Sequence, residues 1–175
     1  KSFGFNENYL RPKKLATAKS DVIDSIIHGI EWLKKEKKID VEDIILLQPT
    51  SPLRKVSDLK KAYKIFKRKN LISLISVTKV RENSLKHIKL SNNRQRWKFV
   101  HKRKKNLFRR QDYPKDHYFV NGAFYFCKYN YLKKNKILVE ENQTYLYETD
   151  SFSSVDIDFR SDLQLAELIL SSKKL

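Results

Sequence analysis

The chain has 175 residues, of which 38 are Lys or Arg and 20 are Asp or Glu, so its formal net charge is +18. With 40% hydrophobic and 12% aromatic residues it is neither collagen-like nor disordered in composition, and its length allows on the order of two-thirds of the unfolded surface to be buried. Composition therefore predicts one domain over residues 1–175, with a charge that suits anionic partners.

The cysteine, glycine and apolar contents exclude several classes of protein. Cys127, the one cysteine, cannot form an internal disulfide, which favours a reducing, cytoplasmic compartment, and no Cys/His set has zinc-ligand spacing. The apolar run at 71–77 is far shorter than the roughly 20 residues that cross a bilayer. Three glycines are too few for either common Gly-rich phosphate loop. Membrane-spanning, zinc-binding and P-loop proteins are thereby excluded.

Residues 21–38 form the first periodic segment, with Ser20 or Asp21 as a suitable N-cap. The apolar residues at helical spacing are Ile23, Ile26, Ile27, Ile30 and Leu33. The spacing predicts an amphipathic helix. Residues 43–47 follow as an uninterrupted apolar run, which predicts a strand covered on both faces and ended by Pro49 and Pro52.

Ser57 can cap a second helix, and residues 71–80 read as a second strand. One face of that helix would carry Leu59, Ala62, Tyr63 and Phe66. The alternation of helix and strand predicts an α/β fold, with a mainly parallel sheet flanked by helices and ligand sites at the carboxyl ends of the strands. The 48–54 loop lies at such an end.

Residues 81–115 interrupt this alternation, because they are polar and strongly basic and carry no helical stripe; they read as a β-rich insertion. Asn121 and Gly122 form a turn pair before a strand at 123–127, and residues 155–158 alternate with the period of a strand. Ser161 and Gln164 make a capping box that opens a last helix. The residues expected to face inward from it are Leu163, Ala166, Ile169 and Leu170.

Two segments could carry chemistry. The 48–54 loop, Gln-Pro-Thr-Ser-Pro-Leu-Arg, offers an amide, two hydroxyls and a guanidinium to one crevice, although these are also ordinary turn residues. Asp156 and Asp158, two positions apart in a predicted strand, can converge on a hard cation such as Mg²⁺, although a solvated sheet edge would look the same. The residue types alone leave both alternatives open.

Residues 94–110 interleave Lys and Arg with Trp97, Phe99 and Phe108, a pattern typical of nucleic-acid surfaces. Lysines also occur on every predicted helix, as a general compositional bias would produce. We therefore prefer a solvated or subunit-contacting face to a nucleic-acid site here. Cys127 lies in a predicted core strand and is interpreted as structural.

Four motifs in order resemble those of the acylneuraminate cytidylyltransferases. They are Arg11-Pro12 with Leu15-Ala16, the 48–54 string, Asn121-Gly122-Ala123-Phe124-Tyr125, and Asp156-Ile157-Asp158. The resemblance covers the whole chain and implies a Rossmann-like fold. It implies an enzyme that joins CTP to a nine-carbon 2-keto-3-deoxy acid sugar, releasing pyrophosphate and leaving the CMP-sugar.

The resemblance also implies roles for individual residues. Asp156 and Asp158 would hold Mg²⁺ against the triphosphate, and Arg11 would hold the cytidine end. The acid-sugar pocket would be lined by Gln48, Lys86, Asn121, Tyr125 and one of Arg109 or Arg110. The two arginines, adjacent in sequence, join the aspartates in the implied catalytic set.

The family is dimeric, which implies a homodimer whose 81–115 arm reaches over the partner's site. Family members begin with a strand and a basic phosphate-gripping loop, for which this chain has no counterpart before Arg11. The alternative is a catalytically incomplete basic module that binds nucleic acid or another polyanion. The identity of the acid sugar stays open between N-acetylneuraminate, legionaminate, pseudaminate and related acids.

Overall fold

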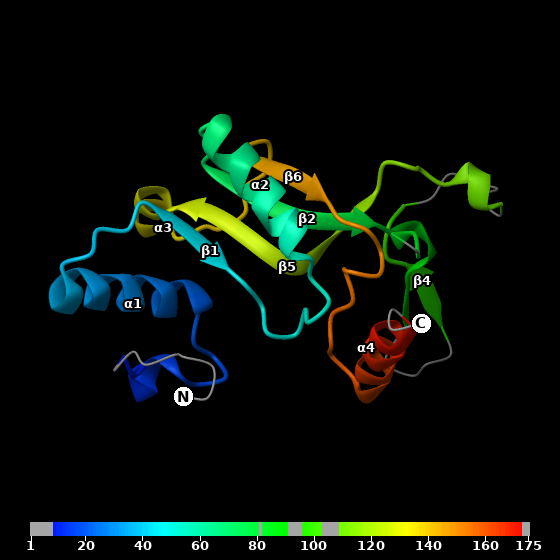
Figure 1. The fold of residues 1–175 in the computed structure, drawn as a ribbon. Coiled ribbons are helices and arrows are strands. Elements are labelled where there is room, and N and C mark those ends of the chain that lie inside the picture. Colours follow the sequence, from blue (N-terminus) through cyan, green and yellow to red (C-terminus); the bar gives the residue numbers. More distant parts are fainter. Residues whose placement is uncertain (1–8, 81, 91–95, 103–108, 173–175) are drawn as a thin grey trace.

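A mixed four-stranded sheet forms the centre of the structure, a computed structural model that describes residues 9–80, 82–90, 96–102 and 109–172 (Figure 1). Its strands, in spatial order, are β1 (Asp43–Leu46), β5 (Tyr118–Lys128), β2 (Ser73–Lys79) and β6 (Thr144–Glu148). Strand β5 pairs antiparallel with both β1 and β2, whereas β6 pairs parallel with β2. The fold is therefore a mixed α/β fold.

The expectation of a mainly parallel sheet holds for strand direction but not for strand pairing. Strands β1, β2 and β6 run the same way, but β5 lies between β1 and β2 and runs against them. Parallel neighbours need a long crossover, usually a helix, whereas antiparallel neighbours do not. The 81–115 segment before β5 supplies no such helix in its described residues, and β5 returns antiparallel.

One face of the sheet is covered by α1 (Val22–Lys37) and α3 (Tyr129–Asn135). The carboxylate of Asp21 caps α1 by accepting a hydrogen bond of 2.8 Å from the backbone N–H of Ile23, and Lys38 ends the helix in the left-handed region. The core on this face consists of Ile23, Ile27, Ile30, Ile44, Cys127 and Leu132. The predicted first helix is confirmed. The predicted first strand forms as well, but it is not covered on both faces as expected, because Ile45 is 42% exposed.

The opposite face is covered by α2 (Val56–Arg68), which buries Ala62 and Phe66. They pack against Leu74 of β2 and against Ala123, Phe124 and Phe126 of β5. The inward face predicted for this helix is confirmed for these two residues and for Leu59, which is partly buried against the same cluster. The fourth residue, Tyr63, stays 40% exposed and stacks on Phe126. Lys55 rather than Ser57 is the N-cap residue, and its side chain makes no capping hydrogen bond.

The Asn121-Gly122 pair is not a turn, contrary to the sequence-based prediction. Both residues lie inside β5, which is longer than expected, and the pairing register shifts between Ile75 and Val77 of the facing strand. Gly122 has φ of +71°, a conformation that side chains other than glycine rarely adopt. The pair therefore marks an irregularity within a strand.

Residues 155–158 do not form a strand, so the predicted alternation is wrong there. The backbone N–H of Ile157 donates instead to Thr50 in the 48–54 loop. The next helix, α4 (Arg160–Ser172), begins with the carboxylate of Asp162 accepting from the backbone N–H groups of Asp158 and Phe159, in place of the predicted capping box. Of the predicted inward residues, Ala166 and Ile169 are buried and Leu163 and Leu170 are about half exposed.

The shorter elements lie outside the main sheet. They are the single turns η1 (Lys13–Leu15), η2 (Ser84–Lys86) and η3 (Arg110–Asp112) and the hairpin of β3 (Ile88–Leu90) with β4 (Trp97–Phe99). The turns η2 and η3 and the strands β3 and β4 confirm short strands and loops in the described part of 81–115. No helix among the described residues is both long and apolar enough to cross a membrane.

Substitution Phe66→Ala tests the α2 side of the core. Phe66 is fully buried between α2 and the sheet, so its truncation is expected to lower the free energy of unfolding by about 3–5 kcal/mol. Urea denaturation measures the loss. Lys60→Ala, on the exposed side of the same helix, should change the free energy by less than about 0.5 kcal/mol. Equal losses in the two variants would contradict this packing.

Candidate functional site

The 48–54 loop leaves the carboxyl end of β1 and is closed by its own hydrogen bonds. The backbone carbonyl of Gln48 accepts from the backbone N–H of Ser51 at 3.3 Å and from the guanidinium of Arg54. Burial lowers the pKa of the Arg54 guanidinium. Arg54 therefore serves the loop's own backbone, whereas the sequence had suggested that it faces an open crevice.

The same loop holds the segment that carries Asp156. The carbonyl of Thr50 accepts from the backbone N–H of Ile157 at 2.8 Å, and the buried hydroxyl of Ser51 donates to Oδ1 of Asp156 at 3.3 Å. Leu53 of the loop is buried against two residues of α4, Ala166 and Ile169. Residues about a hundred positions apart in the sequence thus form one unit.

Strand β5 supplies the other wall of this unit. A Cβ atom on Gly122 would overlap Oε1 of Gln48, so the Gln48 side chain lies directly on the bare glycine backbone. Burial raises the pKa of the Tyr125 hydroxyl, and the negative charge of Asp156 raises it further. Ser51 thus contacts Asp156 and lies beside Gln48 at Gly122, and Tyr125 is close enough to Asp156 for its charge to act on the hydroxyl.

Two adjoining clefts open where β2 ends. The first, of about 350 Å³, is lined by Asp156 together with Phe119, Asp162 and Leu165 among others, and the second, of about 510 Å³, is lined by Lys86. Both include Lys79 and Val80 in their walls. In the second cleft Nζ of Lys86 lies 5.1 Å from the ring centre of Tyr113. The predicted acidic residue Asp156 and the predicted basic residue Lys86 therefore line two neighbouring clefts, with the end of β2 between them.

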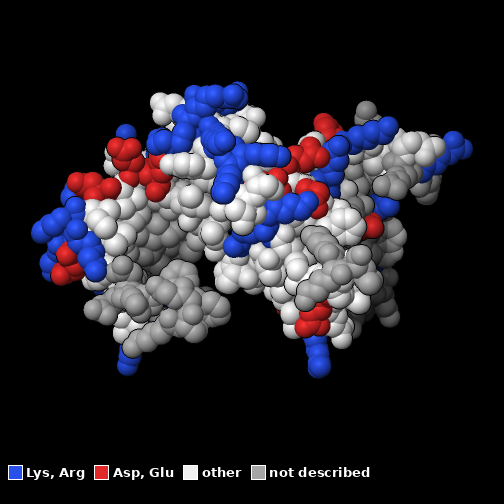
Figure 2. Space-filling view, in the orientation of Figure 1, with Lys and Arg blue, Asp and Glu red and all other residues white. Residues whose placement is uncertain are grey.

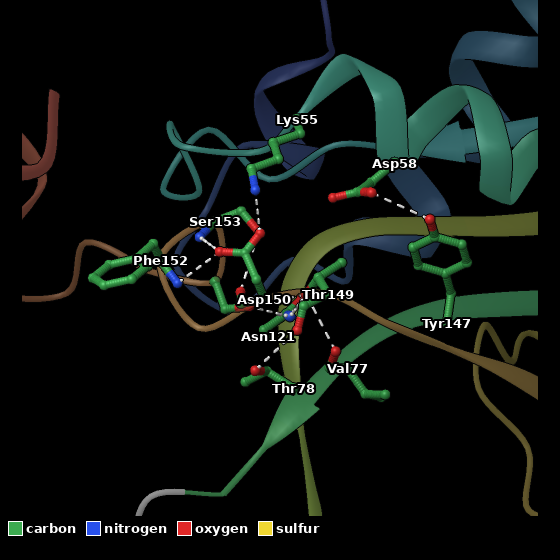
Figure 3. Close-up of polar contacts among 11 residues, drawn as sticks. Lys55, Asp58, Val77, Thr78, Asn121, Tyr147, Thr149, Asp150, Phe152 and Ser153 are labelled. Carbon is green, nitrogen blue, oxygen red and sulfur yellow. Dashed lines mark hydrogen bonds and ion pairs between the residues drawn. The ribbon is translucent and has the colours of Figure 1, made fainter. Parts of the chain in front are cut away.

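Asn121 is buried and its amide is used within the protein (Figure 3). Its Nδ2 donates to the hydroxyls of Thr149 at 2.7 Å and Ser154 at 2.9 Å, and its Oδ1 accepts from the backbone N–H of Ala123. The residue therefore anchors the 149–154 segment that leads to Asp156. Its place in this structure is that of a positioning residue.

A second anchor of this segment, which sequence reasoning missed, is the ion pair between Lys55 and Asp150 (Figure 3). Nζ of Lys55 lies 2.5 Å from the Asp150 carboxylate, which also accepts from the backbone N–H groups of Phe152 and Ser153 and from the Ser153 hydroxyl. Burial alone would raise the pKa of Asp150, but these hydrogen bonds outweigh it and hold the pKa well below its ordinary value. The Asp-x-x-Ser-Ser spacing is a signal for such a turn.

The remaining predicted residues are not gathered at this cluster. Arg11 is exposed ahead of η1, and within the described residues no contact joins it to Asp156. Arg109 is exposed, with its backbone N–H donating to Asp112, and the Arg110 side chain lies outside the described residues. Asp158 is exposed as well and does not line the first cleft.

The basic aromatic segment is described only in part. Arg94, residues 103–105 and Phe108 lie outside the described residues, whereas Trp97 and Phe99 pack edge to face on each other with ring centres 5.1 Å apart. At least one face of this aromatic pair is thus occupied within the chain.

Three carboxylates line the first cleft, those of Glu82, Asp156 and Asp162, and of these Asp156 is a predicted metal ligand. The described residues contain no group of three His, Cys, Asp or Glu side chains placed to hold a metal ion. The prediction assumed that Asp156 and Asp158 share one face of a strand. They do not, because residues 155–158 are not a strand. Asp156 remains as a carboxylate that lines a cleft.

Comparisons with known proteins give two informative relatives, while no family model matches the chain. The chain is 31% identical over 173 residues to CMP-N,N'-diacetyllegionaminic acid synthase of Legionella pneumophila, covering 96% of this chain and 70% of that protein. It is 26% identical over 152 residues to post-translational flagellin modification protein B of Campylobacter coli, covering 87% of this chain and 61% of that protein.

Acid titration of stability tests the Lys55–Asp150 anchor. Since the folded state holds the pKa of Asp150 below its ordinary value, its contribution is complete above pH about 4 and is lost as the pH falls below that value. Asp150→Asn should lower the free energy of unfolding at pH 6 by about 1–2 kcal/mol, because the carboxylate is partly exposed and partly screened. Urea denaturation between pH 3 and 7 should show this difference shrinking in acid. Asp40→Asn, from an exposed pair with Lys34, should show neither effect; a difference that does not vary with pH would contradict the assignment.

A double-mutant cycle tests the contact between Gly122 and Gln48. Gly122→Ala is expected to cost about 1–3 kcal/mol of unfolding free energy, because the methyl group meets the Gln48 amide and the backbone has positive φ. Adding Gln48→Ala should recover about 1 kcal/mol of that loss, since it removes the colliding group. Additive effects of the two substitutions, measured by urea denaturation, would show that the side chain does not lie on Gly122.

Proposed function

The chain belongs to the acylneuraminate, or sialic-acid-type, cytidylyltransferase family, and from this premise we propose that it transfers CMP from CTP to the anomeric hydroxyl of a nine-carbon 2-keto-3-deoxy acid sugar. The alignments span 70% and 61% of the two relatives, so the proposal concerns the protein to which these residues belong. We also infer that the mixed sheet is the central part of a Rossmann-like fold.

One observation supports the proposal above all others: the hydrogen bond of Ser51 to Asp156. It joins the second and fourth of the four family-like motifs. Gln48 of the second motif lies on Gly122 of the third, and the charge of Asp156 acts on Tyr125 of the third. Motifs separated along the chain are expected to meet in space when they serve one reaction. The Asp156 carboxylate also lines a cleft, which a purely structural contact between the two motifs would not require.

In the proposed reaction the anomeric oxygen of the sugar bonds to the α-phosphorus of CTP. The bond from that phosphorus to the bridging oxygen of pyrophosphate breaks, pyrophosphate leaves with its electron pair, and the hydroxyl proton passes to solvent or to a nearby carboxylate. Such a transfer is accelerated by holding the two substrates in line and by neutralising charge. Gln48 and Tyr125 would orient the substrates, and Ser51 would hold the Asp156 carboxylate in place.

Asp156 is chemically suited to hold Mg²⁺ at this cleft, because magnesium is commonly bound through one or two carboxylates together with substrate phosphates and water. Asp158, two residues further and exposed, would be the second carboxylate. The bound ion would neutralise triphosphate charge. Arg11 would contact the cytidine end once the nucleotide is bound.

The acid sugar would lie toward the second cleft. Its carboxylate would pair with Lys86 and with Arg109 or Arg110, since paired N–H donors suit planar oxyanions. Asn121 would contribute through the segment that it anchors. A homodimer in which the 81–115 arm of one protomer reaches the cleft of its partner would complete the site.

Pyrophosphate release from CTP tests the proposal. The protein, expressed with any residues that its gene encodes before Lys1, is assayed with Mg²⁺ and with N-acetylneuraminate, N,N'-diacetyllegionaminate or pseudaminate. We expect release with at least one acid, and Asp156→Asn should lower kcat/KM on the order of 100-fold or more, because a charge-neutralising carboxylate is lost. The matched control is Asp40→Asn, which changes an exposed carboxylate distant from Asp156 in the sequence and should keep full activity.

Two results would count against the proposal. One is the absence of pyrophosphate release with all three acids from a folded protein, and the other is an Asp156→Asn variant as active as the wild type. If the protein instead shifts DNA and RNA at low salt, with affinity that falls steeply as salt rises, the basic-module alternative would replace it.

A further inference from the structure

The outer side of α2 is a continuous basic surface that the proposed reaction does not use. At helical spacing, Lys60, Lys61, Lys64, Lys67 and Arg68 fall on one side of the helix, opposite the buried Ala62 and Phe66. Figure 2 shows Lys and Arg gathered along the top of the molecule, over α2. In the described part of the chain, Lys67 is paired with Asp43, whereas Lys60, Lys61, Lys64 and Arg68 form no ion pair.

Beside this surface runs a groove of about 710 Å³, lined by six residues of α2 and by Tyr147 of β6. Lys61, Lys64, Lys67 and Arg68 stand around it, and Tyr63, Ile65 and Tyr147 contribute apolar surface. The Tyr147 hydroxyl donates to Asp58, so its ring is held in the wall of the groove (Figure 3). A ligand that fits must combine negative charge with apolar surface.

Strand β6 adds a second feature that limits the choice of ligand. It is the last strand of the sheet, and within the described residues it pairs with β2 alone, so its other edge presents backbone N–H and C=O groups. Tyr145 and Tyr147 face α2, whereas Leu146 points to the opposite side and is 52% exposed. An added strand would meet cations on one face and an apolar side chain on the other.

We propose that the groove between α2 and β6 binds an extended acidic segment of a partner protein by strand addition to β6. Backbone hydrogen bonds to β6 supply affinity, as in other cases of strand addition. Asp or Glu at alternate positions reach Lys61, Lys64 and Arg68, while their methylene groups cover Tyr147. The intervening apolar side chains lie beside Leu146. The partner is thus a strand with one acidic and one apolar face.

These observations favour a peptide over a nucleic acid. Stacking of bases requires open aromatic faces, but the Tyr147 ring packs against Phe124 and one face of the Tyr63 ring is taken by Phe126, so the outer face of Tyr63 is what these two rings offer. The exposed strand edge offers hydrogen bonds that match a peptide backbone and have no counterpart in a sugar-phosphate chain. Charge alone would not distinguish the two partners, but this edge does.

Fluorescence anisotropy with the full chain tests the proposal. The probe is a labelled peptide of about eight alternating Glu and Val residues, long enough to span β6. The combined substitutions Lys61→Glu, Lys64→Glu and Arg68→Glu should raise its Kd about 10-fold or more. The matched control, Lys34→Glu, Lys35→Glu and Lys37→Glu on exposed positions of α1, changes net charge equally and should raise Kd less than about 3-fold.

Probe variants tested on the wild-type protein keep the test independent of the folding of any variant. The same peptide with alternate N-methylated amides cannot complete a strand ladder and should bind about 10-fold more weakly. Polyglutamate of equal length, which has no apolar face, should also bind more weakly.

Three outcomes would overturn the proposal: equal binding of the N-methylated peptide, an equal loss in the α1 control, or tighter binding of oligothymidylate that is lost in the α2 variant. The last result would identify a phosphate-binding surface instead. Pyrophosphate release from CTP is measured in parallel and should not change in the α2 variant, so a failure here is distinct from a failure of the proposed enzyme activity.

Discussion

The contact between the 48–54 loop and residues 156–157 is the constraint on which the site depends. Two hydrogen bonds, from Ile157 to Thr50 and from Ser51 to Asp156, fix a carboxylate from the C-terminal third of the chain at the carboxyl end of β1. Leu53 adds apolar burial against α4. Because the Ser51 hydroxyl is buried, leaving it without its acceptor would cost about 1–3 kcal/mol, so this register of the two segments is favoured over its neighbours.

The segment that enters this contact is prepared by polar anchors further back. The backbone N–H of Thr149, just beyond β6, donates to the carbonyl of Val77 in β2. The Asn121 amide donates to the hydroxyls of both Thr149 and Ser154. Asp150 accepts hydrogen bonds within its own turn and forms an ion pair with Lys55. These anchors come from β2, β5 and the start of α2. An irregular segment positioned in this way can hold a catalytic group as firmly as a strand would, because its backbone groups are paired in the same manner.

Sequence patterns correctly predicted the helices and strands that are determined by their own residues. The isoleucine spacing in α1, the apolar run of β1 and the buried residues Ala62 and Phe66 of α2 follow from periodicity, which a single segment contains. The strand assigned to Asp156 and Asp158 failed because a partner more than a hundred residues away determines that backbone. Asn121-Gly122 failed for a similar reason, since the neighbouring strand and Gln48 explain why the glycine is needed. The edge strand β6 and the short helix α3 were not predicted at all.

The distribution of charge connects these findings with the sequence. A net charge of +18 could be a uniform consequence of composition, but the fold sorts it. Some lysines are neutralised structurally, as Lys67 and Lys128 are by Asp43 and Lys55 is by Asp150. Lys79 and Lys86 are paired with the exposed carboxylates of Glu148 and Glu82 and line the clefts at the end of β2. In the proposed reaction a triphosphate and an acid sugar would bring several negative charges there. Lys60, Lys61, Lys64 and Arg68 of α2 have neither role among the residues that the structure describes. Their position next to the outer edge of β6, which has no partner strand there, is the reason to treat them as a surface with a function of its own.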